Sequence, residues 1–172
     1  MRKSTLIGSL GLILLFALVV CAAEGQDRGI VTRKYSEGPA KPEQRVALVV
    51  GNSAYETVPL RNPVNDARSM GRTLAELGFD VAVRENLTQK EMKMEIQAFG
   101  QKLQKGGVGL FYFAGHGIQV NGRNFLIPVG AKIEHEKQVE YEGVDAGSVL
   151  AEMEFARNRL NIVILDACRD NH

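Results

Sequence analysis

Four short apolar runs stand out in the chain after residue 44, and each is too short for a buried helix. They cover residues 46–50, 79–83, 108–113 and 162–165. Continuous runs of this length, rich in β-branched residues, are typical of strands that are buried on both faces of a parallel sheet. We therefore predict four core strands, the last of which delivers Asp166 and Cys168 at its carboxyl end.

Between these runs, apolar residues recur with the spacing of amphipathic helices. The first helix is predicted to begin at Asn62, an amino-terminal cap followed by proline, and to end at Gly78. The second opens with a capping box formed by Thr88 and Glu91. The apolar stripes are Val64, Ala67, Met70, Leu74 and Leu77; Met92, Ile96, Phe99 and Leu103; and, behind a cap at Asp145, Val149, Leu150, Met153 and Ala156.

Strands that alternate with helices predict an α/β fold, with a parallel sheet covered on both faces and right-handed crossovers. Residues 117–128 form an exception. Asn121-Gly122 is typical of a tight hairpin turn, so this segment is predicted to be a hairpin that stands as a wall over His116. Residues 131–141 are charged and are predicted to be a solvated loop.

The amino terminus has the pattern of a secretory signal peptide. Arg2 and Lys3 precede an uncharged apolar run, residues 6–20, and small residues follow it. We predict a signal peptide over residues 1–23 and an exported protein, periplasmic or secreted. Two alternatives stay open: an uncleaved membrane anchor, for which the run is short, and lipid attachment at Cys21.

The remaining chain divides into two parts. Residues 24–44 are polar, contain Gly and Pro and lack an apolar period, so we expect a flexible linker. Residues 45–172 are expected to form one domain, because a chain of 172 residues with 45% hydrophobic content fits a single core.

Charge and cysteine content narrow the classes of function. The chain has 21 basic and 20 acidic side chains, and removal of Arg2 and Lys3 leaves 19 against 20, a net charge near −1. This balance does not favour binding to nucleic acid or to an anionic membrane surface. The exported chain would keep one cysteine, Cys168, and a lone thiol in an oxidising compartment is either inert and buried or reactive.

The placement of Cys168 and His116 favours the reactive alternative. His116 follows the third apolar run between Gly115 and Gly117, and the carboxyl ends of parallel strands meet at one edge of a sheet. An imidazole beside a thiol favours the thiolate and later protonates the leaving group. The amides of Gly117 and Cys168 could stabilise a developing oxyanion.

Less reactive interpretations of these residues also stay open. Cys168 could be a small core residue and His116 a turn residue. A metal site of Cys168 with His172 lacks further ligands, and His135 lies in the charged segment. A small-molecule-binding flavodoxin-like protein would need a glycine-rich phosphate loop that residues 51–54 do not provide.

The motifs that carry a family resemblance are Phe-Ala-Gly-His116-Gly, Leu-Asp-Ala-Cys168-Arg, the leading Arg-Val-Ala-Leu-Val-Val-Gly-Asn and Asn65-Asp66-Ala67. Together they resemble the caspase-fold cysteine peptidases, in particular the bacterial metacaspase-like branch. The histidine also precedes the cysteine at about the distance of the caspase signature. The resemblance implies a three-layer sandwich with a mostly parallel sheet flanked by helices. It also implies that His116 is the general base and acid, Cys168 the nucleophile, and Gly117 with Cys168 the oxyanion hole.

The resemblance also implies a substrate class. Asp166 stands where caspases carry glutamine, as in metacaspases, whose specificity pocket pairs it with the aspartate found here as Asp66. Two carboxylates would hold an arginine or lysine side chain by charge-assisted hydrogen bonds. The alternatives are that Asp66 only decorates its helix, or that Arg61 lies at a caspase-type pocket that selects aspartate.

Caspase-like domains are expected to continue past the cysteine strand into a small subunit with two more strands. This chain is therefore expected to be a large-subunit portion, truncated after Cys168, whose last strand forms an open sheet edge. The partners expected are a peptide or protein substrate and, at this edge, a small-subunit-like chain or a second copy. The alternative function is a catalytically silent caspase-like module that binds a partner there. No metal or other cofactor is predicted, because the acidic residues 134–142 lack a ligand-like spacing.

Overall fold

The computed structural model describes residues 43–103 and 107–170, with the side chains of residues 168–170 outside this description. The predicted signal peptide and nearly all of the predicted linker lie outside the described residues, and both stay predictions. Among the residues that the structure describes, no helix combines the length and the hydropathy needed to cross a bilayer.

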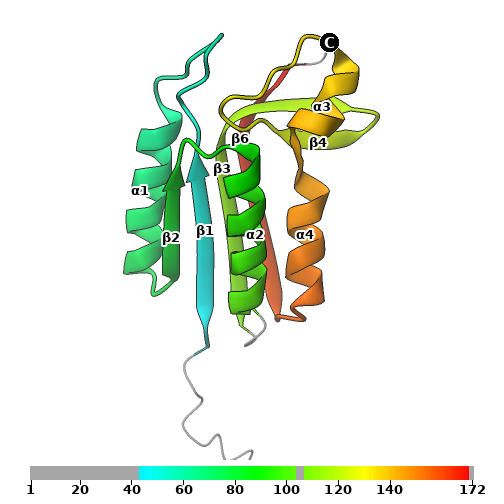
Figure 1. Ribbon diagram of the computed structural model, residues 1–172. Helices are drawn as coiled ribbons and strands as arrows, with labels where there is room; N and C mark the ends of the chain where they lie inside the picture. The colour runs from blue at the N-terminus through cyan, green and yellow to red at the C-terminus, as the bar shows by residue number, and fades with distance from the viewer. Residues whose placement is uncertain (1–42, 104–106, 171–172) are drawn as a thin grey trace, which may run out of the picture. The chain divides into compact units, whose positions relative to one another are not determined.

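A six-stranded mixed sheet forms the centre of the domain (Figure 1). The strands are β1 (Arg45–Gly51), β2 (Asp80–Glu85), β3 (Val108–Val120), β4 (Arg123–Leu126), β5 (Val144–Asp145) and β6 (Leu160–Asp170). The helices are α1 (Pro63–Glu76), α2 (Gln89–Leu103), α3 (Glu136–Glu142) and α4 (Ala146–Phe155). Strands β2, β1, β3 and β6 are mutually parallel, whereas β4 and β5 are antiparallel additions.

The long strand β3 organises this sheet. Its residues 108–118 pair with β6 along one edge, while residues 108–114 pair with β1 and residues 117–120 with β4. Because β6 occupies one edge throughout, β1 and β4 share the opposite edge, one following the other along β3. At the carboxyl end of β1, the neighbour of β3 on this edge therefore changes from β1 to β4.

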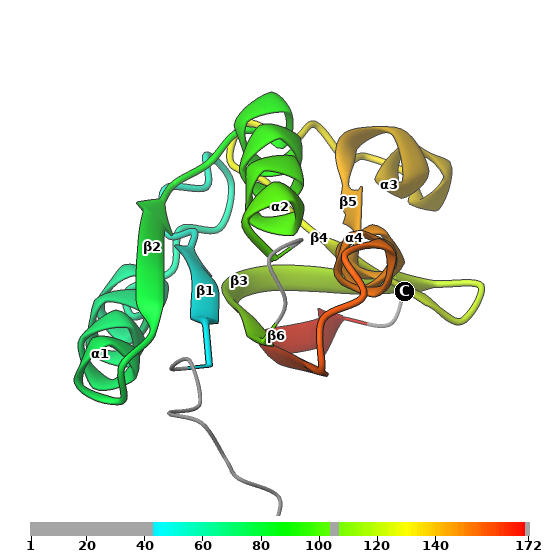
Figure 2. The ribbon, with the colours of Figure 1, turned by 90° about the horizontal axis from the view of Figure 1, so that it is seen from below.

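Helices cover both faces of the sheet, as expected for three layers (Figure 2). On one face, Ala47 and Val49 of β1 pack against Ala67 and Leu74 of α1. On the other face, the alternate residues of β1 pack against α2 and α4. The alternation of side chains along each strand places both sets in a core, which explains the unbroken apolar run of β1.

Most local signals of the first two helices are confirmed. Helix α1 begins at Pro63, and Gly78 beyond its end adopts a φ of 82°. The side chain of Asn62 makes no capping hydrogen bond, which corrects the predicted cap. The capping box of α2 is present, since Glu91 Oε2 accepts from the Thr88 amide at 2.9 Å and from its hydroxyl at 2.7 Å.

The predicted apolar stripes need two corrections. Leu77 is 57% exposed and Leu150 is 42% exposed, so neither belongs to the core. Leu77 follows the last helical residue of α1, and Leu150 lies on a helix whose buried residues are Val149 and Met153. The cap of α4 is confirmed, because the side chain of Asp145 accepts from the Gly147 amide.

Residues 131–141 are not a solvated loop throughout, because α3 begins at Glu136. Its capping box joins His135 and Gln138, and Val139 is only 1% exposed. Val139 packs in one apolar cluster with Val120 and Phe125 of the hairpin, so this short helix docks against the hairpin. The Asn121-Gly122 turn of the hairpin is confirmed, with φ angles of 50° and 77°.

Strand β6 is confirmed as a strand, but the prediction that both its faces are buried is wrong. Val163 and Ile164 are each 37% exposed, and Leu165 is 38% exposed. Among the described residues, β6 pairs only with β3, and no strand covers its second edge. The apolar run therefore lies at an open edge.

Candidate active site at the carboxyl end of the sheet

His116 and Cys168 are backbone partners in the structure. Strands β3 and β6 are parallel and in register, with His116 opposite Cys168. Neighbouring strands lie roughly 4.8 Å apart, so two residues from distant parts of the chain are adjacent. The side chain of Cys168 lies outside the described residues. His116 lies inside β3 rather than in a turn after it, because β6 and the hairpin supply partners that extend the strand.

The imidazole of His116 is held by the loop between β1 and α1. Its Nε2 lies 2.8 Å from the carbonyl oxygen of Val58. A carbonyl oxygen can only accept, so Nε2 carries the hydrogen in this contact and the neutral ring leaves Nδ1 with its lone pair. The ring of Tyr55 lies against the imidazole, with centroids 4.4 Å apart. The contacts of the imidazole thus come from this loop. The predicted hairpin segment contacts His116 through the backbone, since the Ile127 amide donates to the His116 carbonyl at 3.0 Å.

Tyr55 also holds the backbone of the site. Its hydroxyl accepts from the amide of His116 at 2.9 Å and donates to the carbonyl of Ile127 at 3.0 Å. Burial raises the pKa of Tyr55 to about 12, so the hydroxyl stays a donor at neutral pH. A side chain at Gly115 would collide with it, since a Cβ there would lie 2.5 Å from the Tyr55 oxygen.

Asn52, like Tyr55, supports the site although its sequence context did not indicate such a role. Its side chain is fully buried. Its Nδ2 donates to the carbonyls of Leu87 at 3.4 Å and Ile127 at 3.3 Å, and its Oδ1 accepts from the Leu87 amide at 2.9 Å. Asn52 therefore ties together the segments that follow β1, β2 and β4. In the sequence, Asn52 only indicated a turn after the first strand.

The two predicted specificity residues line one pocket of about 210 Å³. Asp66 comes from the first turn of α1, and Asp166 comes from β6. Arg61, the alternative specificity residue, also lines this pocket. The remaining lining residues are Leu60, Asn62, Pro63, Ala114 and Gly115. A cationic side chain and two carboxylates therefore share one hollow beside the His116 strand.

Gly117, the predicted oxyanion residue, lies inside β3. Its partners in register are Leu126 of β4 and Arg169 of β6. It directly follows His116, at the point where β3 pairs with strands on both edges. The donor role of its amide stays a prediction.

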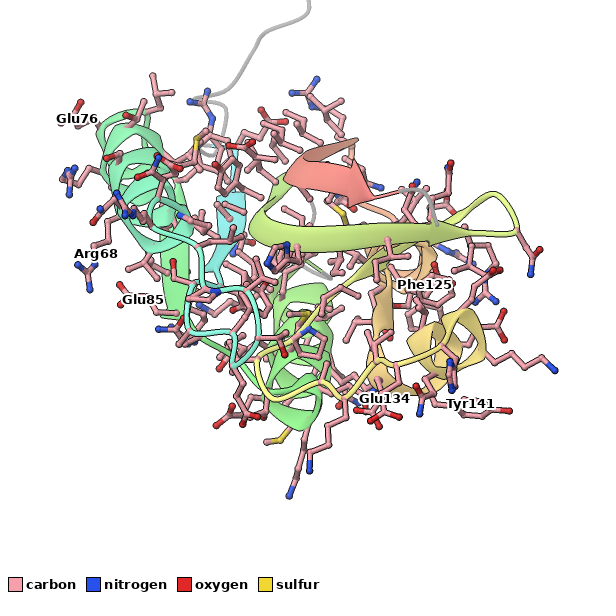
Figure 3. All side chains as sticks on the ribbon, turned by 90° about the horizontal axis from the view of Figure 1, so that it is seen from above. Arg68, Glu76, Glu85, Phe125, Glu134 and Tyr141 are labelled. Atoms are coloured by element: carbon pink, nitrogen blue, oxygen red, sulfur yellow. The ribbon has the colours of Figure 1, made fainter. Side chains whose placement is uncertain are left out.

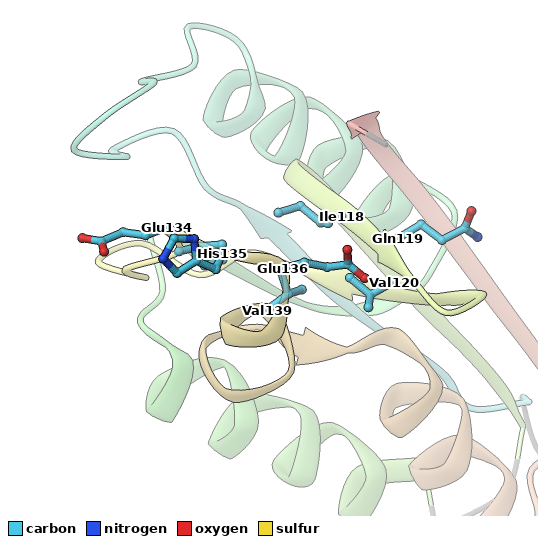
Figure 4. Close-up of a pocket in the computed structure, with 8 residues that line it drawn as sticks. Ile118, Gln119, Val120, Glu134, His135, Glu136 and Val139 are labelled. Carbon is cyan, nitrogen blue, oxygen red and sulfur yellow. The ribbon is translucent and has the colours of Figure 1, made fainter. Parts of the chain in front are cut away.

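A larger hollow lies beside the hairpin and α3 (Figure 4). It has a volume of about 360 Å³, and Glu134, His135 and Glu136 line it together with apolar residues of β3. His135 serves as the amino-terminal cap of α3. Within the described ranges, no three His, Cys, Asp or Glu side chains are grouped closely enough to hold a metal ion.

Comparisons with known proteins agree with this architecture. The sequence profile of the caspase domain, peptidase family C14, matches residues 44–172. Mucosa-associated lymphoid tissue lymphoma translocation protein 1 of Homo sapiens is 33% identical over 128 residues, which are 74% of this chain and 15% of that protein. Caspase-1 of Sus scrofa is 38% identical over 78 residues, covering 44% of this chain and 19% of caspase-1.

Two solved structures share the fold. The Drosophila initiator caspase Dronc superimposes with a TM-score of 0.57 at 16% identity, over 73% of this chain and 50% of that chain. A Geobacter sulfurreducens protein superimposes with a TM-score of 0.58 at 20% identity, over 75% of this chain and 52% of that chain. This chain thus spans about half of these solved chains and less than a fifth of the two curated relatives named above. With its profile match, its relatives and its helix-flanked mixed sheet in agreement, the chain belongs to the caspase domain family.

Proposed function

We propose that this chain is the catalytic part of a cysteine endopeptidase that uses His116 and Cys168 as a dyad and cleaves after arginine or lysine. The observation that carries the proposal is the in-register pairing of His116 with Cys168 on adjacent parallel strands. Membership of the caspase domain family supports the reaction class.

The contact of His116 with Val58 supports different roles for the two imidazole nitrogens. Nε2–H is held by the carbonyl, so Nδ1 is the nitrogen available to take the proton of the Cys168 thiol. The thiolate attacks the peptide carbonyl, and the amides of Gly117 and Cys168 donate to the oxyanion that forms. The imidazolium then gives its proton to the leaving amine as the carbon–nitrogen bond breaks.

The second half of the reaction restores the enzyme. His116 takes a proton from water, and the hydroxide so formed attacks the thioester carbonyl. Collapse of the intermediate breaks the carbon–sulfur bond and releases the carboxylic acid product. The imidazolium gives its proton to the departing thiolate, which restores the thiol of Cys168 and the neutral imidazole of His116. Each step needs only the dyad and water, and no metal or cofactor takes part in the proposed scheme.

The pocket that contains Asp66 and Asp166 supports the substrate class. A guanidinium presents N–H donors in a planar fork that matches carboxylate oxygens, and charged hydrogen bonds are the stronger kind. Arg61 at the same pocket favours the opposite preference, for an acidic side chain. The two carboxylates outnumber the one cation, so we propose that a basic side chain binds there.

We further propose that the open edge of β6 receives a strand from the remainder of a caspase domain, whichever polypeptide carries it. Apolar side chains on both faces of an exposed strand support this, because such a composition is typical of a strand inside a sheet. The solved relatives are about twice as long as the matched part of this chain. A Val163→Lys variant should weaken concentration-dependent association in sedimentation experiments; unchanged association would contradict the role of the edge.

Labelling with an arginyl chloromethylketone tests the dyad. Mass spectrometry of the full chain should locate one adduct on Cys168, and the Cys168→Ala variant should carry none. His135→Ala serves as a matched control, because His135 caps α3 and should leave labelling unchanged. An adduct that persists in Cys168→Ala, or no adduct in the unaltered chain, would refute the enzyme proposal.

A panel of fluorogenic peptides tests the specificity. The peptides differ only in the residue before the cleaved bond, which is arginine, lysine or aspartate. We expect cleavage after arginine and lysine and little after aspartate. Preference for aspartate would assign the pocket to Arg61 instead.

A further inference from the structure

Tyr112 on β3 contacts Asp166, one of the residues that line the candidate specificity pocket. Its side chain is only 4% exposed and belongs to the core on the α1 face of the sheet. Its hydroxyl donates a hydrogen bond of 3.1 Å to Oδ2 of Asp166. In the sequence, Tyr112 is one member of an apolar run and has no sign of a role beyond packing.

The register of the strands explains why this contact forms. Tyr112 pairs with Ile164, and Ala114 pairs with Asp166, so the hydroxyl reaches diagonally to the next residue on the same face. Ala114 stands directly opposite Asp166, and both residues line the pocket. The tyrosine ring is therefore buried while its hydroxyl meets an exposed carboxylate at the pocket.

The hydroxyl remains a donor at every pH at which a peptidase would be assayed. Burial raises the pKa of Tyr112, and the carboxylates of Asp166 and Asp66 raise it further. Both predicted specificity residues are thus close enough to Tyr112 for their negative charges to disfavour its ionised form.

We propose that Tyr112 is a positioning residue for recognition of a basic side chain, because its hydroxyl holds the Asp166 carboxylate in one orientation beside Asp66. This inference rests on the proposed function for its substrate. A carboxylate that is already ordered loses less conformational freedom when a ligand binds. A planar guanidinium gains more from this order than an ammonium, because its forked donors need a fixed partner.

Kinetics of the Tyr112→Phe variant of the full chain provide the first test. Peptides with arginine, lysine or citrulline before the cleaved bond should be compared, since citrulline has the shape of arginine without its charge. We expect kcat/KM for the arginine peptide to fall roughly fivefold to tenfold, mainly through KM. The lysine and citrulline peptides should change less. Tyr141→Phe is the matched control, because Tyr141 is 79% exposed and lies outside the pocket.

A second test does not depend on catalysis. Agmatine, an isolated guanidinium on an alkyl chain, should be titrated into the Cys168→Ala chain by NMR. Tyr112→Phe should weaken its binding roughly fivefold to tenfold, and Asp166→Asn should weaken it at least as much. In the Asp166→Asn background the tyrosine substitution should have no further effect, because the two residues act as one unit.

The two tests separate the failure of this inference from the failure of the proposed function. If agmatine binds the Cys168→Ala chain and its variants in this pattern but the unaltered chain hydrolyses no peptide, the peptidase proposal fails and the inference holds. If Tyr112→Phe stays within about twofold of the unaltered chain in both tests, or if agmatine does not bind, the inference is overturned. Should Tyr112→Phe not fold, Asp166→Asn in the Cys168→Ala chain still decides, because agmatine binding that this substitution leaves unchanged would overturn the inference.

Discussion

Replacing Tyr55 with phenylalanine would test how the candidate site is held together. The substitution removes one oxygen atom and leaves the ring that lies against the imidazole of His116. It deletes two hydrogen bonds, one from the amide of His116 at 2.9 Å and one to the carbonyl of Ile127 at 3.0 Å. The first of these belongs to β3, and the second to the segment that follows β4.

The magnitude follows from what the two partners lose. A buried donor or acceptor that is left without a partner costs about 1–3 kcal/mol. The Ile127 carbonyl keeps a longer bond of 3.3 Å from Asn52, which limits its loss. We therefore expect the free energy of unfolding to fall by about 2–4 kcal/mol, a large part of the 5–15 kcal/mol that is typical of a domain.

Urea unfolding at neutral pH measures this change. With a typical denaturant slope, the midpoint should fall by roughly 1–2 M while the slope stays the same. The matched control is Tyr141→Phe, which makes the same chemical change at a side chain that is 79% exposed and should leave the midpoint unchanged. A decrease below about 0.5 kcal/mol in Tyr55→Phe would show that the hydroxyl does not support the site and would refute the reasoning.

Three further predictions concern the same domain. Asn52→Ala removes three hydrogen bonds of a fully buried amide and should lower the free energy of unfolding by about 2–4 kcal/mol in urea; a loss confined to the surface range of about 0.5 kcal/mol would contradict its bridging role. Gly51→Ala places a Cβ 2.5 Å from the carbonyl oxygen of Pro63 and should cost about 1–3 kcal/mol, so an unchanged thermal midpoint would show that α1 can move away. The hydrogen bond from Arg68 holds the pKa of Glu85 below its usual range (Figure 3). The stability that this ion pair adds is therefore fully present above the pKa of Glu85 in the unfolded chain, about 4.3. It is lost as the pH falls through the lower pKa of Glu85 in the folded chain. On acidification, the free energy of unfolding measured in urea should therefore fall less for Glu85→Gln than for the unaltered chain. The difference should be small because the ion pair is exposed to solvent. Parallel pH profiles of the two chains would show that protonation of Glu85 is not coupled to stability.

Local order could be predicted from the sequence alone. The apolar runs, the capping box of Thr88 with Glu91 and the Asn121-Gly122 turn depend on contacts within a few residues, and each is present in the structure. The pairing of His116 with Cys168 was also predictable, because parallel strands align their carboxyl ends. The three-layer fold follows from the same alternation of strands and helices.

Only the tertiary structure decided burial and the surroundings of the site. The apolar composition of β6 indicated a buried strand, yet its exposure depends on which strands lie beside it. The loop contacts of His116 come from Tyr55 and Val58, which are 61 and 58 residues away along the chain. Hydrogen bonds across such distances leave no local pattern in the sequence. Tyr55 and Val58 lie in a loop, and only the pairing of the strands brings this loop beside His116. The sequence thus determined which segments become strands and helices, and the packing of the sheet decided which side chains surround the imidazole.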